Sequence, residues 1–359
     1  MLVHFRHGEP YQRARAHGLR ARLMPTISKQ TLKRLFVRWV KGTEMTKPIC
    51  SVVIPTRDCL DYLKQSIPTI YQQKLDDVEI IIVDDGSTDG SHEYLAECQK
   101  NDKNFVVLQT DGIGPGRARN HAIEQANSDL IAFLDADDLW TEGKLGRQLA
   151  FHTAHPDASL SFTDYVHFRP GEPLSGSSFD YWGRDFLKPN QTGYEVIEHP
   201  EAVLLQHNIV GTATVIAKRE SLQNANGFAT DLQSATDWDM WMKLAGMGEV
   251  GVSPEIGMHY LMRPGSVTQN RQNRIDAIDF IIDRYRARTE PEMIKAVRLA
   301  EANLAVARAE YDYERGRGWD SLRHYFEAIS KNPSKRSIWA AGYSVACGVQ
   351  NTLGIKKAA

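Results

Sequence analysis

Short apolar runs rich in β-branched residues alternate with helical patterns over residues 48–165. The runs predict strands at 51–54, 79–83, 104–108 and 129–134, and the spacing between them predicts helices near 60–73, 90–101, 116–127 and 141–155. Strands this short and this apolar are buried on both faces, so helices must cover the sheet above and below. The pattern therefore predicts an α/β fold with a mostly parallel sheet.

The rest of the chain is patterned differently. Residues 166–270 are less regular, with a Gly-, Pro- and Ser-rich loop at 170–178, a strand predicted at 212–218 and a helix predicted from Asp237. Residues 271–359 form a C-terminal region that is largely helical, with apolar positions at helical spacing in 277–285, 293–311 and 322–329. We therefore divide the chain into 1–47, 48–165, 166–270 and 271–359.

The N-terminal extension, residues 1–47, is strongly basic. It holds eleven Lys and Arg against two acids, a net charge of +9, while the other 312 residues carry −11. Within it, 32–40 has apolar residues at helical spacing with basic residues between them, which predicts a short amphipathic helix. This helix either packs on the acidic body or contacts an anionic membrane surface. A third interpretation is that Met45 is the natural start.

Composition excludes several classes of protein. Hydrophobic residues make up 42% and charged residues 25%, as in soluble globular proteins, and no run of 18 strongly apolar residues occurs. The four cysteines are widely spaced, which argues against a zinc ribbon or a disulfide framework and fits a reducing cytosol. We find no signal-peptide pattern. Residues 337–355 are uncharged but too polar to predict a membrane-spanning helix, and they could lie in a membrane interface.

Acids, glycines and arginines follow the predicted strands. The chain reads PTRD at 55–58, DDGSTDG at 84–90, TDGIGPG at 110–116 before Arg117 and Arg119, and DADD at 135–138. Because ligands of open parallel sheets bind at the carboxyl ends of the strands, these segments should meet at one edge. The GxGxG at 112–116 does not match a dinucleotide fingerprint, and we interpret it as a turn that aims a helix N-terminus at a phosphate.

Two of these acids, Asp135 and Asp137, are candidate metal ligands. Residues two apart in extended backbone point the same way, so both carboxylates can face one ion. Hard divalent cations such as Mg²⁺ or Mn²⁺ prefer oxygen ligands of this kind and share them with substrate phosphates. A turn with solvated acids is the alternative, and the buried strand that leads to this turn favours the metal site.

Asp237 lies in the segment TDWD at 236–239, which opens a predicted helix. Thr236 and Asp239 have the spacing of a capping box. By spacing alone, Asp237 is either a functional carboxylate or an acid that the dipole favours in the first turn.

Five segments in order, SVVIPTRD, VDDGSTDGS, GRARNHAI, FLDADDLW and TDWDMWMKLA, resemble the family 2 inverting glycosyltransferases of GT-A fold. The resemblance spans about residues 48–265. It implies a Rossmann-like GT-A domain in which 48–165 bind a nucleotide-diphosphate sugar and 166–270 shape the acceptor site. The sequence departs from the family at Arg57-Asp58, where an aromatic residue and Asn are usual, and at Thr236, where Glu is commoner.

The resemblance also implies a role for individual residues. Pro55, Arg57 and Asp85 would hold the nucleoside, Arg119 would assist the diphosphate, and Asp135 and Asp137 would be the DxD metal motif. Asp237 would be the catalytic base. In a segment that closes over the diphosphate, Arg263 and Ser266 are candidate donor-binding residues, and His259 is a weaker candidate for a third metal ligand.

The function implied by this resemblance is inverting transfer of a sugar from a nucleotide-diphosphate sugar, UDP-linked in our expectation, to a hydroxyl of a glycan or lipid-linked acceptor. We expect a cytoplasmic enzyme at the inner face of the plasma membrane in cell-surface polysaccharide or lipopolysaccharide assembly, with Mg²⁺ or Mn²⁺ and without a nucleic-acid partner. The alternatives are a sugar-nucleotide nucleotidyltransferase and a catalytically degenerate binding module. The nucleotide product distinguishes the three.

Overall fold

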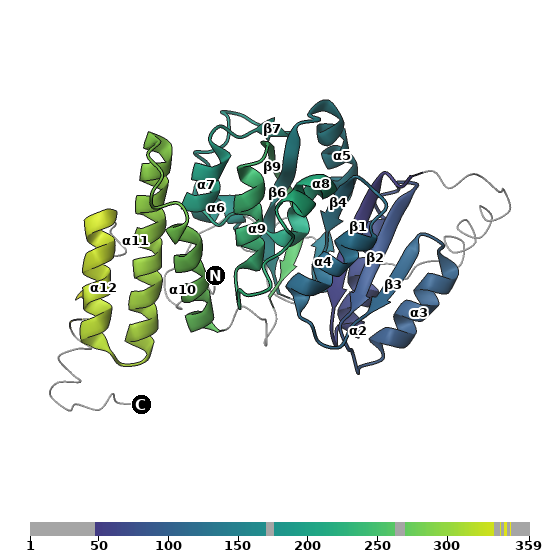
Figure 1. The fold of residues 1–359 in the computed structure, drawn as a ribbon, viewed down its shortest axis with the longest axis horizontal. Coiled ribbons are helices and arrows are strands. Elements are labelled where there is room, and N and C mark those ends of the chain that lie inside the picture. The colour runs from purple at the N-terminus through teal and green to yellow at the C-terminus, as the bar shows by residue number, and fades with distance from the viewer. Residues whose placement is uncertain are drawn as a thin grey trace, which may run out of the picture.

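The computed structural model describes residues 47–169, 176–262 and 270–333, together with residues 338, 341, 342 and 345. Within this part of the chain, one sheet has the strand order β3-β2-β1-β4-β8-β6-β9-β5, and β7 pairs with β9. Figure 1 shows helices on both sides of this sheet and three C-terminal helices at the end opposite β3. The predicted α/β class is confirmed.

The first half of the sheet is parallel and contains every strand predicted for residues 48–165. Its strands are β1 (Cys50–Thr56), β2 (Val78–Asp84), β3 (Phe105–Gln109) and β4 (Leu130–Phe133). The connecting helices are α2 (Leu60–Tyr71), α3 (Ser91–Asn101) and α4 (Pro115–Gln125), and α5 (Lys144–Ala154) follows a short strand β5 (Leu139–Trp140). Parallel strands need such crossovers, which explains the strict alternation in the sequence.

Successive strand residues pack on opposite faces of the sheet. On β1, Val53 belongs to a cluster shared with α4, α7 (Pro200–Gln206) and α9 (Thr236–Ala245). Its neighbours Val52 and Ile54 belong to a second cluster, shared with α2, α3 and α5. This two-sided burial is why the strands are continuously apolar.

The second half of the sheet is mixed. Strand β8 (Ile216–Lys218) is antiparallel to β4 and to β6 (Ala158–Phe168), whereas β6 is parallel to β9 (Glu249–Leu261). Strands β5 and β7 (Glu195–Val196) are antiparallel to β9. Helices α6 (Ser178–Trp182) and α8 (Arg219–Asn224) complete this half. Because β8 bridges β4 and β6, both halves share one sheet.

The prediction of a strand over 212–218 is only half right. Residues Thr212–Thr214 form a 3-10 turn, and the strand begins at Ile216. The Thr214 hydroxyl donates to the carbonyl of Gly211 at 2.7 Å, and this local bond competes with strand pairing. The turn matters because it places the Thr212 side chain beside α9.

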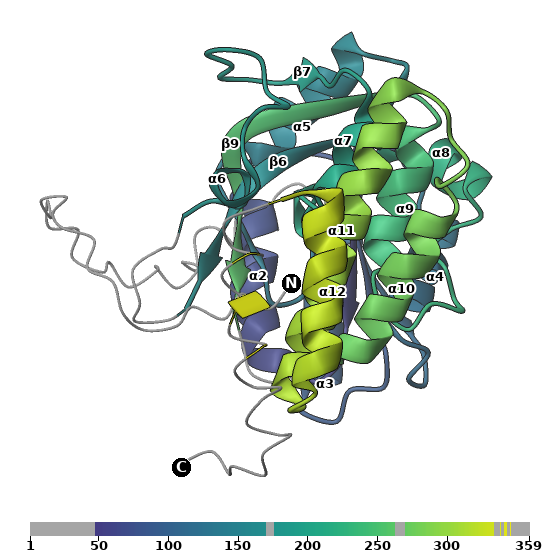
Figure 2. The same cartoon turned by 90° about the vertical axis from the view of Figure 1, so that its left-hand side faces the viewer.

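The C-terminal helices are α10 (Arg271–Asp283), α11 (Pro291–Glu314) and α12 (Gly318–Lys331). Helix α11 packs against α7, and α12 packs against α11 as an antiparallel hairpin (Figure 2). No helix among the described residues is long and apolar enough to cross a membrane.

Candidate active site

Backbone hydrogen bonds join the loops that follow β1, β2 and β3. The amide of Asp85 donates to the carbonyl of Thr56 at 2.8 Å, and the amide of Thr110 donates to the carbonyl of Asp84 at 3.0 Å. A side chain also joins the loops after β1 and β2: the Thr88 amide donates to the Asp58 carboxylate at 2.7 Å. The predicted assembly of these loops at one edge of the sheet is therefore present.

Asp85 organises the glycine-rich loop after β3. One carboxylate oxygen accepts from the Thr110 hydroxyl at 2.6 Å and the Ile113 amide at 2.7 Å, and the other accepts from the Gly114 amide at 2.8 Å. Burial opposes its ionisation, but these hydrogen bonds outweigh that effect and lower the pKa of Asp85 below its usual range. The carboxylate is therefore charged and fixed in orientation, and it holds the glycine-rich loop at this edge of the sheet.

Arg57 is exposed and Pro55 is half-buried at the end of β1. The Arg57 guanidinium lies against Gly112, where an added Cβ would be 3.0 Å from its Nη1. Gly112 has φ +72°, a conformation that disfavours any side chain. Arg57 thus reaches the loop that Asp85 holds, so two of the three predicted nucleoside-binding residues meet at one turn.

Arg119, on α4, forms an ion pair with Asp135 at the end of β4. The Arg119 side chain is buried, and its guanidinium carbon lies 5.6 Å from the centre of the Phe228 ring. Its Nε is buried without a hydrogen-bond partner among the described residues.

Asp138 is a site residue that sequence reasoning missed. It is buried, and its carboxylate accepts from the Leu261 amide at 3.3 Å, which ties the end of β9 to the DxD turn. Burial raises the pKa of Asp138 well above its usual range, and the charges of Asp135 and Asp137 raise it further. The signal in the sequence that could have identified it is a third acid directly after Asp135 and Asp137.

The oxygen chemistry of this turn fits a hard divalent cation. Asp135, Asp137 and Asp138 place three carboxyl groups within four residues, where the charges of the first two raise the pKa of Asp138, and a cation would relieve that repulsion. Among the described residues, however, no group of three or more His, Cys, Asp or Glu side chains is arranged as a metal site. His259 lies on β9, opposite Leu139 of β5, and burial lowers its pKa. A protein-supplied third ligand is thus absent from the described part of the chain.

Asp237 lies in the first turn of α9 and is half-buried. One of its oxygens accepts from the Trp238 amide at 2.9 Å and the other from the Thr212 hydroxyl at 3.2 Å. The Trp238 indole donates to the carbonyl of Leu204 at 2.8 Å, which anchors the start of the helix. The carboxylate is therefore oriented by two elements that are distant in sequence.

The predicted capping box at Thr236 and Asp239 is wrong. The N-cap is Ala235, at φ 53°, and no side chain caps this helix. Asp239 is buried and instead forms ion pairs with Lys243, at 2.8 Å, and with Arg284 of α10. Lys243 lies one helical turn from Asp239, and the docking of α10 brings Arg284 to it. These two ion pairs stabilise the carboxylate more than a cap at the start of α9 would.

Tyr165 lies on β6, and its ring packs beside Gly211, where an added Cβ would be 3.1 Å from Cε1. Burial raises the pKa of Tyr165 to about 12; a hydrogen bond with Ser178 opposes this, and the negative charges of Asp164, Asp138 and Asp237 add to it. Its hydroxyl therefore stays protonated at neutral pH, within the field of both Asp138 and Asp237. No sequence motif marked this residue, because its position is set by the pairing of β6 with β9.

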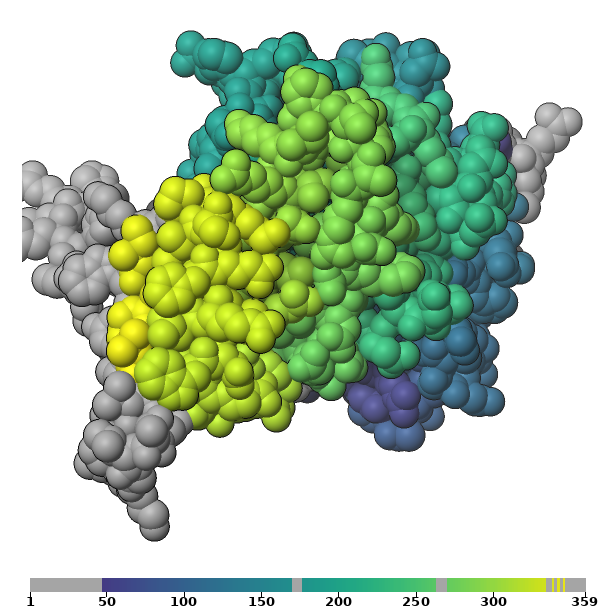
Figure 3. All heavy atoms as spheres, turned by 60° about the vertical axis from the view of Figure 1, so that its left-hand side comes forward, coloured from purple at the N-terminus to yellow at the C-terminus, as the bar shows by residue number. Residues whose placement is uncertain are grey.

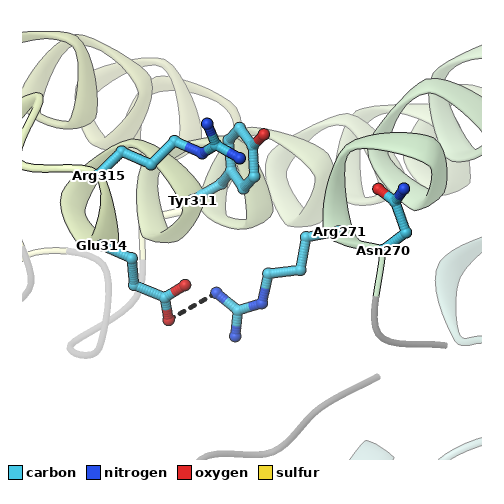
Figure 4. Close-up of a pocket in the computed structure, with 5 residues that line it drawn as sticks. All are labelled: Asn270, Arg271, Tyr311, Glu314 and Arg315. Carbon is cyan, nitrogen blue, oxygen red and sulfur yellow. Dashed lines mark ion pairs between the residues drawn. The ribbon is translucent and has the colours of Figure 1, made fainter. Parts of the chain in front are cut away.

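A hollow of about 530 Å³ lies elsewhere, between the start of α10 and the end of α11. Figure 4 shows Arg271 and Glu314 pointing toward each other across it, 2.7 Å apart, with Arg315 stacked on Tyr311. Asn270 completes the lining. None of the predicted donor-binding, metal-binding or catalytic residues lines this hollow. Two of them, Arg263 and Ser266, lie outside the described residues, as does the N-terminal extension up to Thr46.

Comparisons with known proteins agree with this geometry. The family model described as Glycosyl transferase family 2 matches residues 51–208. The putative teichuronic acid biosynthesis glycosyltransferase TuaG of Bacillus subtilis is 31% identical over 208 residues, which are 56% of this chain and 74% of that protein.

Two solved structures share the fold. Staphylococcus aureus TarS 1-349 in complex with UDP-GlcNAc aligns with a TM-score of 0.57 at 19% identity, covering 84% of this chain and 88% of that one. The mannosyltransferase PcManGT of Pyrobaculum calidifontis, in complex with GDP-Man and Mn²⁺, aligns with a TM-score of 0.55 at 18% identity, covering 91% and 95%. With the strand-end motifs in place on this sheet, the chain belongs to the family 2 glycosyltransferases.

Proposed function

We propose that this glycosyltransferase moves a sugar from a UDP-linked donor to a hydroxyl of a glycan or lipid-linked acceptor, with inversion at the anomeric carbon. The observation that carries the proposal is the start of α4, which lies beside both acidic segments: a Cβ on Gly116 would be 3.8 Å from the Thr236 hydroxyl, and Arg119, on the next turn, forms an ion pair with Asp135. It supports one reaction space bounded by the DxD turn on one side and by the start of α9 on the other.

In this mechanism Asp237 is the catalytic base. The acceptor oxygen attacks the anomeric carbon from the face opposite the diphosphate, its proton passes to an Asp237 oxygen, and the bond from carbon to the diphosphate oxygen breaks. The Thr212 hydroxyl bonds to one oxygen of the Asp237 carboxylate and the Trp238 amide bonds to the other. Each oxygen therefore keeps a lone pair that can accept the proton. General-base catalysis of this kind contributes about 10²–10⁴-fold.

The donor would lie along the loops after β1, β2 and β3. Asp85 fixes the Gly112–Gly114 turn, and a remaining lone pair can accept from the nucleobase. Arg119, held beside Asp135, would assist the diphosphate with its positive charge. Asp135 and Asp137 would hold Mg²⁺ or Mn²⁺, which neutralises charge growing on the departing diphosphate.

We further propose that the enzyme works in cell-surface polysaccharide assembly at the inner face of the plasma membrane. The name of the TuaG relative, a teichuronic acid biosynthesis enzyme, supports this pathway class. The crystallised TarS complexes with UDP and UDP-GlcNAc support a uridine donor.

The decisive experiment measures the nucleotide released from a panel of nucleotide sugars with Mn²⁺ and a glycan acceptor. UDP release supports the transferase, whereas pyrophosphate would indicate the nucleotidyltransferase and no product would indicate a binding module. In the same assay Asp237→Asn should lower kcat by at least about 10²-fold with donor affinity unchanged. The exposed Asp231→Asn is the matched control. If Asp237→Asn keeps more than a tenth of wild-type kcat, Asp237 is not the base.

The metal proposal has its own test. Asp137→Ala should abolish the Mn²⁺-dependent part of UDP affinity in calorimetry, because one of two ion ligands is removed while the strand-end turn remains. Unchanged UDP affinity with Mn²⁺ in this variant would refute the DxD assignment.

A further inference from the structure

Helix α10 and its C-cap carry three arginines, of which one has no partner in the described part of the chain. Arg271 forms an ion pair with Glu314 at 2.7 Å, and Arg284 forms one with Asp239. The Arg274 guanidinium makes no hydrogen bond or ion pair with any residue that the structure describes. Its charge therefore needs a different explanation from that of its two neighbours.

Arg274 lies on the buried face of α10. It precedes Ala277 and Ile281 by three and seven residues, a spacing that puts all three side chains on one face, and both of those residues are buried. Arg274 itself is half-buried, and burial lowers the pKa of its guanidinium. Its nitrogens are not sealed from solvent, however, so a ligand can reach them. The side chain thus points toward the body of the domain without a partner there.

Helix α10 brings Arg274 to the side of the molecule that holds the candidate active site. The ion pair between Arg284 and Asp239 lays α10 along α9, whose first turn carries Asp237. Ten residues of helix, a rise of about 15 Å, separate Arg274 from Arg284. Figure 1 shows the first turn of α10 toward the lower side of the view, where α4 also begins after β3. Arg274 therefore lies toward the edge at which the parallel strands end.

This position is closer to the proposed acceptor side than to the donor side. The loops after β1, β2 and β3, which hold the proposed nucleoside site, are at one end of the sheet, and the C-terminal helices are at the other. Figure 3 shows α10 and α11, in green, between the yellow atoms of α12 and the teal atoms of the domain. Helix α10 thus borders the half of the domain that we assign to the acceptor.

The charges at the start of α10 favour an anion. The first turn of this helix, all of it described, holds Arg271 and Arg274 and no acid, although the helix dipole disfavours cations there. Residues 263–269, which lead into α10, read RPGSVTQ and add no acid. Glu314 compensates Arg271 only. A guanidinium donates through a planar fork that matches a phosphate or a carboxylate.

We propose that Arg274 binds an anionic group of the acceptor, a phosphate or a carboxylate on the part of the acceptor away from the reacting hydroxyl. The inference rests on the proposed transferase function and names the chemical class of its acceptor. The reacting hydroxyl lies at Asp237 in that mechanism, so Arg274 holds the acceptor and touches no reacting atom. A neutral glycan would leave the guanidinium unpaired, whereas an anionic acceptor supplies the partner that the described chain lacks.

The test titrates three small probes into the full chain saturated with UDP and Mn²⁺, so that the proposed donor site is occupied. Glycerol phosphate, glucuronate and glycerol offer a phosphate, a carboxylate and no charge. In calorimetry the wild type should bind at least one of the two anions and should not bind glycerol. Arg274→Gln should bind that anion at least about tenfold more weakly, because charged hydrogen bonds are lost. Arg274→Lys should keep part of the affinity, because it keeps the charge without the planar fork.

Arg323→Gln, at an exposed arginine of α12, is the matched control and should bind the anions as the wild type does. Arg274→Gln should bind UDP with wild-type affinity in a separate titration, because Arg274 lies on the acceptor side. In urea this variant should unfold at the same concentration as the wild type or at a higher one, since no partner in the described chain is lost. A purely structural arginine would instead lower that concentration.

Three results would overturn the inference. Neither anion binds the wild type more tightly than glycerol does, Arg274→Gln binds the anions as the wild type does, or Arg274→Gln weakens UDP binding as much as anion binding, which would make Arg274 a donor-binding residue. The proposed function fails by a different result: a wild type that does not bind UDP refutes that function, and this inference falls with it. A wild type that binds UDP but neither anion refutes this inference alone.

Discussion

Lys144 offers the sharpest test of the energetics of this fold. It begins α5 and is fully buried, and its Nζ has no hydrogen-bond partner among the described residues. The ammonium lies 4.2 Å from the centre of the Trp140 ring, a contact that compensates only part of the lost hydration. Burial lowers the pKa of Lys144 to about 7.

The stability effect follows from the difference between folded and unfolded pKa. The unfolded value is 10.5, so between pH 7 and about 10.5 the unfolded chain binds more protons than the folded chain, and stability rises with pH. The gap between about 7 and 10.5 makes the buried ammonium destabilising by about 5 kcal/mol once it is protonated in both states, and about 4 kcal/mol of that destabilisation is present at pH 7. Below pH 7 both states are protonated and the full penalty applies.

Lys144→Met keeps the length of the side chain and removes the amine. We expect its free energy of unfolding to exceed that of the wild type by about 4 kcal/mol at pH 7, with the difference shrinking toward pH 10. The assay is urea unfolding at pH 7, 8, 9 and 10. Lys103→Met, at an exposed lysine, should change stability by less than about 0.5 kcal/mol at every pH. If Lys144→Met is no more stable at pH 7, or its advantage does not fall with pH, the buried ammonium is not destabilising.

Two further substitutions test contacts that position the site. Asp85→Asn places an amide group against the loop amides, so the Ile113 or the Gly114 amide loses its acceptor and the loop beside the predicted nucleoside site is no longer held; we expect UDP to bind at least about tenfold more weakly in calorimetry. Wild-type UDP affinity would contradict this role. Asp239→Asn breaks a buried ion pair and should cost about 3–5 kcal/mol in urea unfolding, with part of the loss recovered in Asp239→Asn/Arg284→Met. Additive losses in the double variant would show that the pair does not couple α9 to α10.

The sequence by itself determined the parallel half of the sheet and the segments that carry the chemistry. Strands β1 to β4 are short, apolar and separated by amphipathic helices, so local periodicity was enough to locate them. The positions of Asp85 and Asp135 followed, because the carboxyl ends of parallel strands share one edge.

Only the tertiary structure decided what those residues touch. Asp85 bonds to Thr110, 25 residues away, and Asp237 to Thr212, also 25 residues away, and no local pattern records either pair. Tyr165 lies opposite Met258 because β6 pairs with β9, a register set by packing rather than by residue type. The wrong prediction of a cap at Asp239 has the same cause. Burying the Asp239 carboxylate required charged partners, and one of them, Arg284, is 45 residues away in sequence. Ion pairs therefore replaced the local hydrogen bond of a cap.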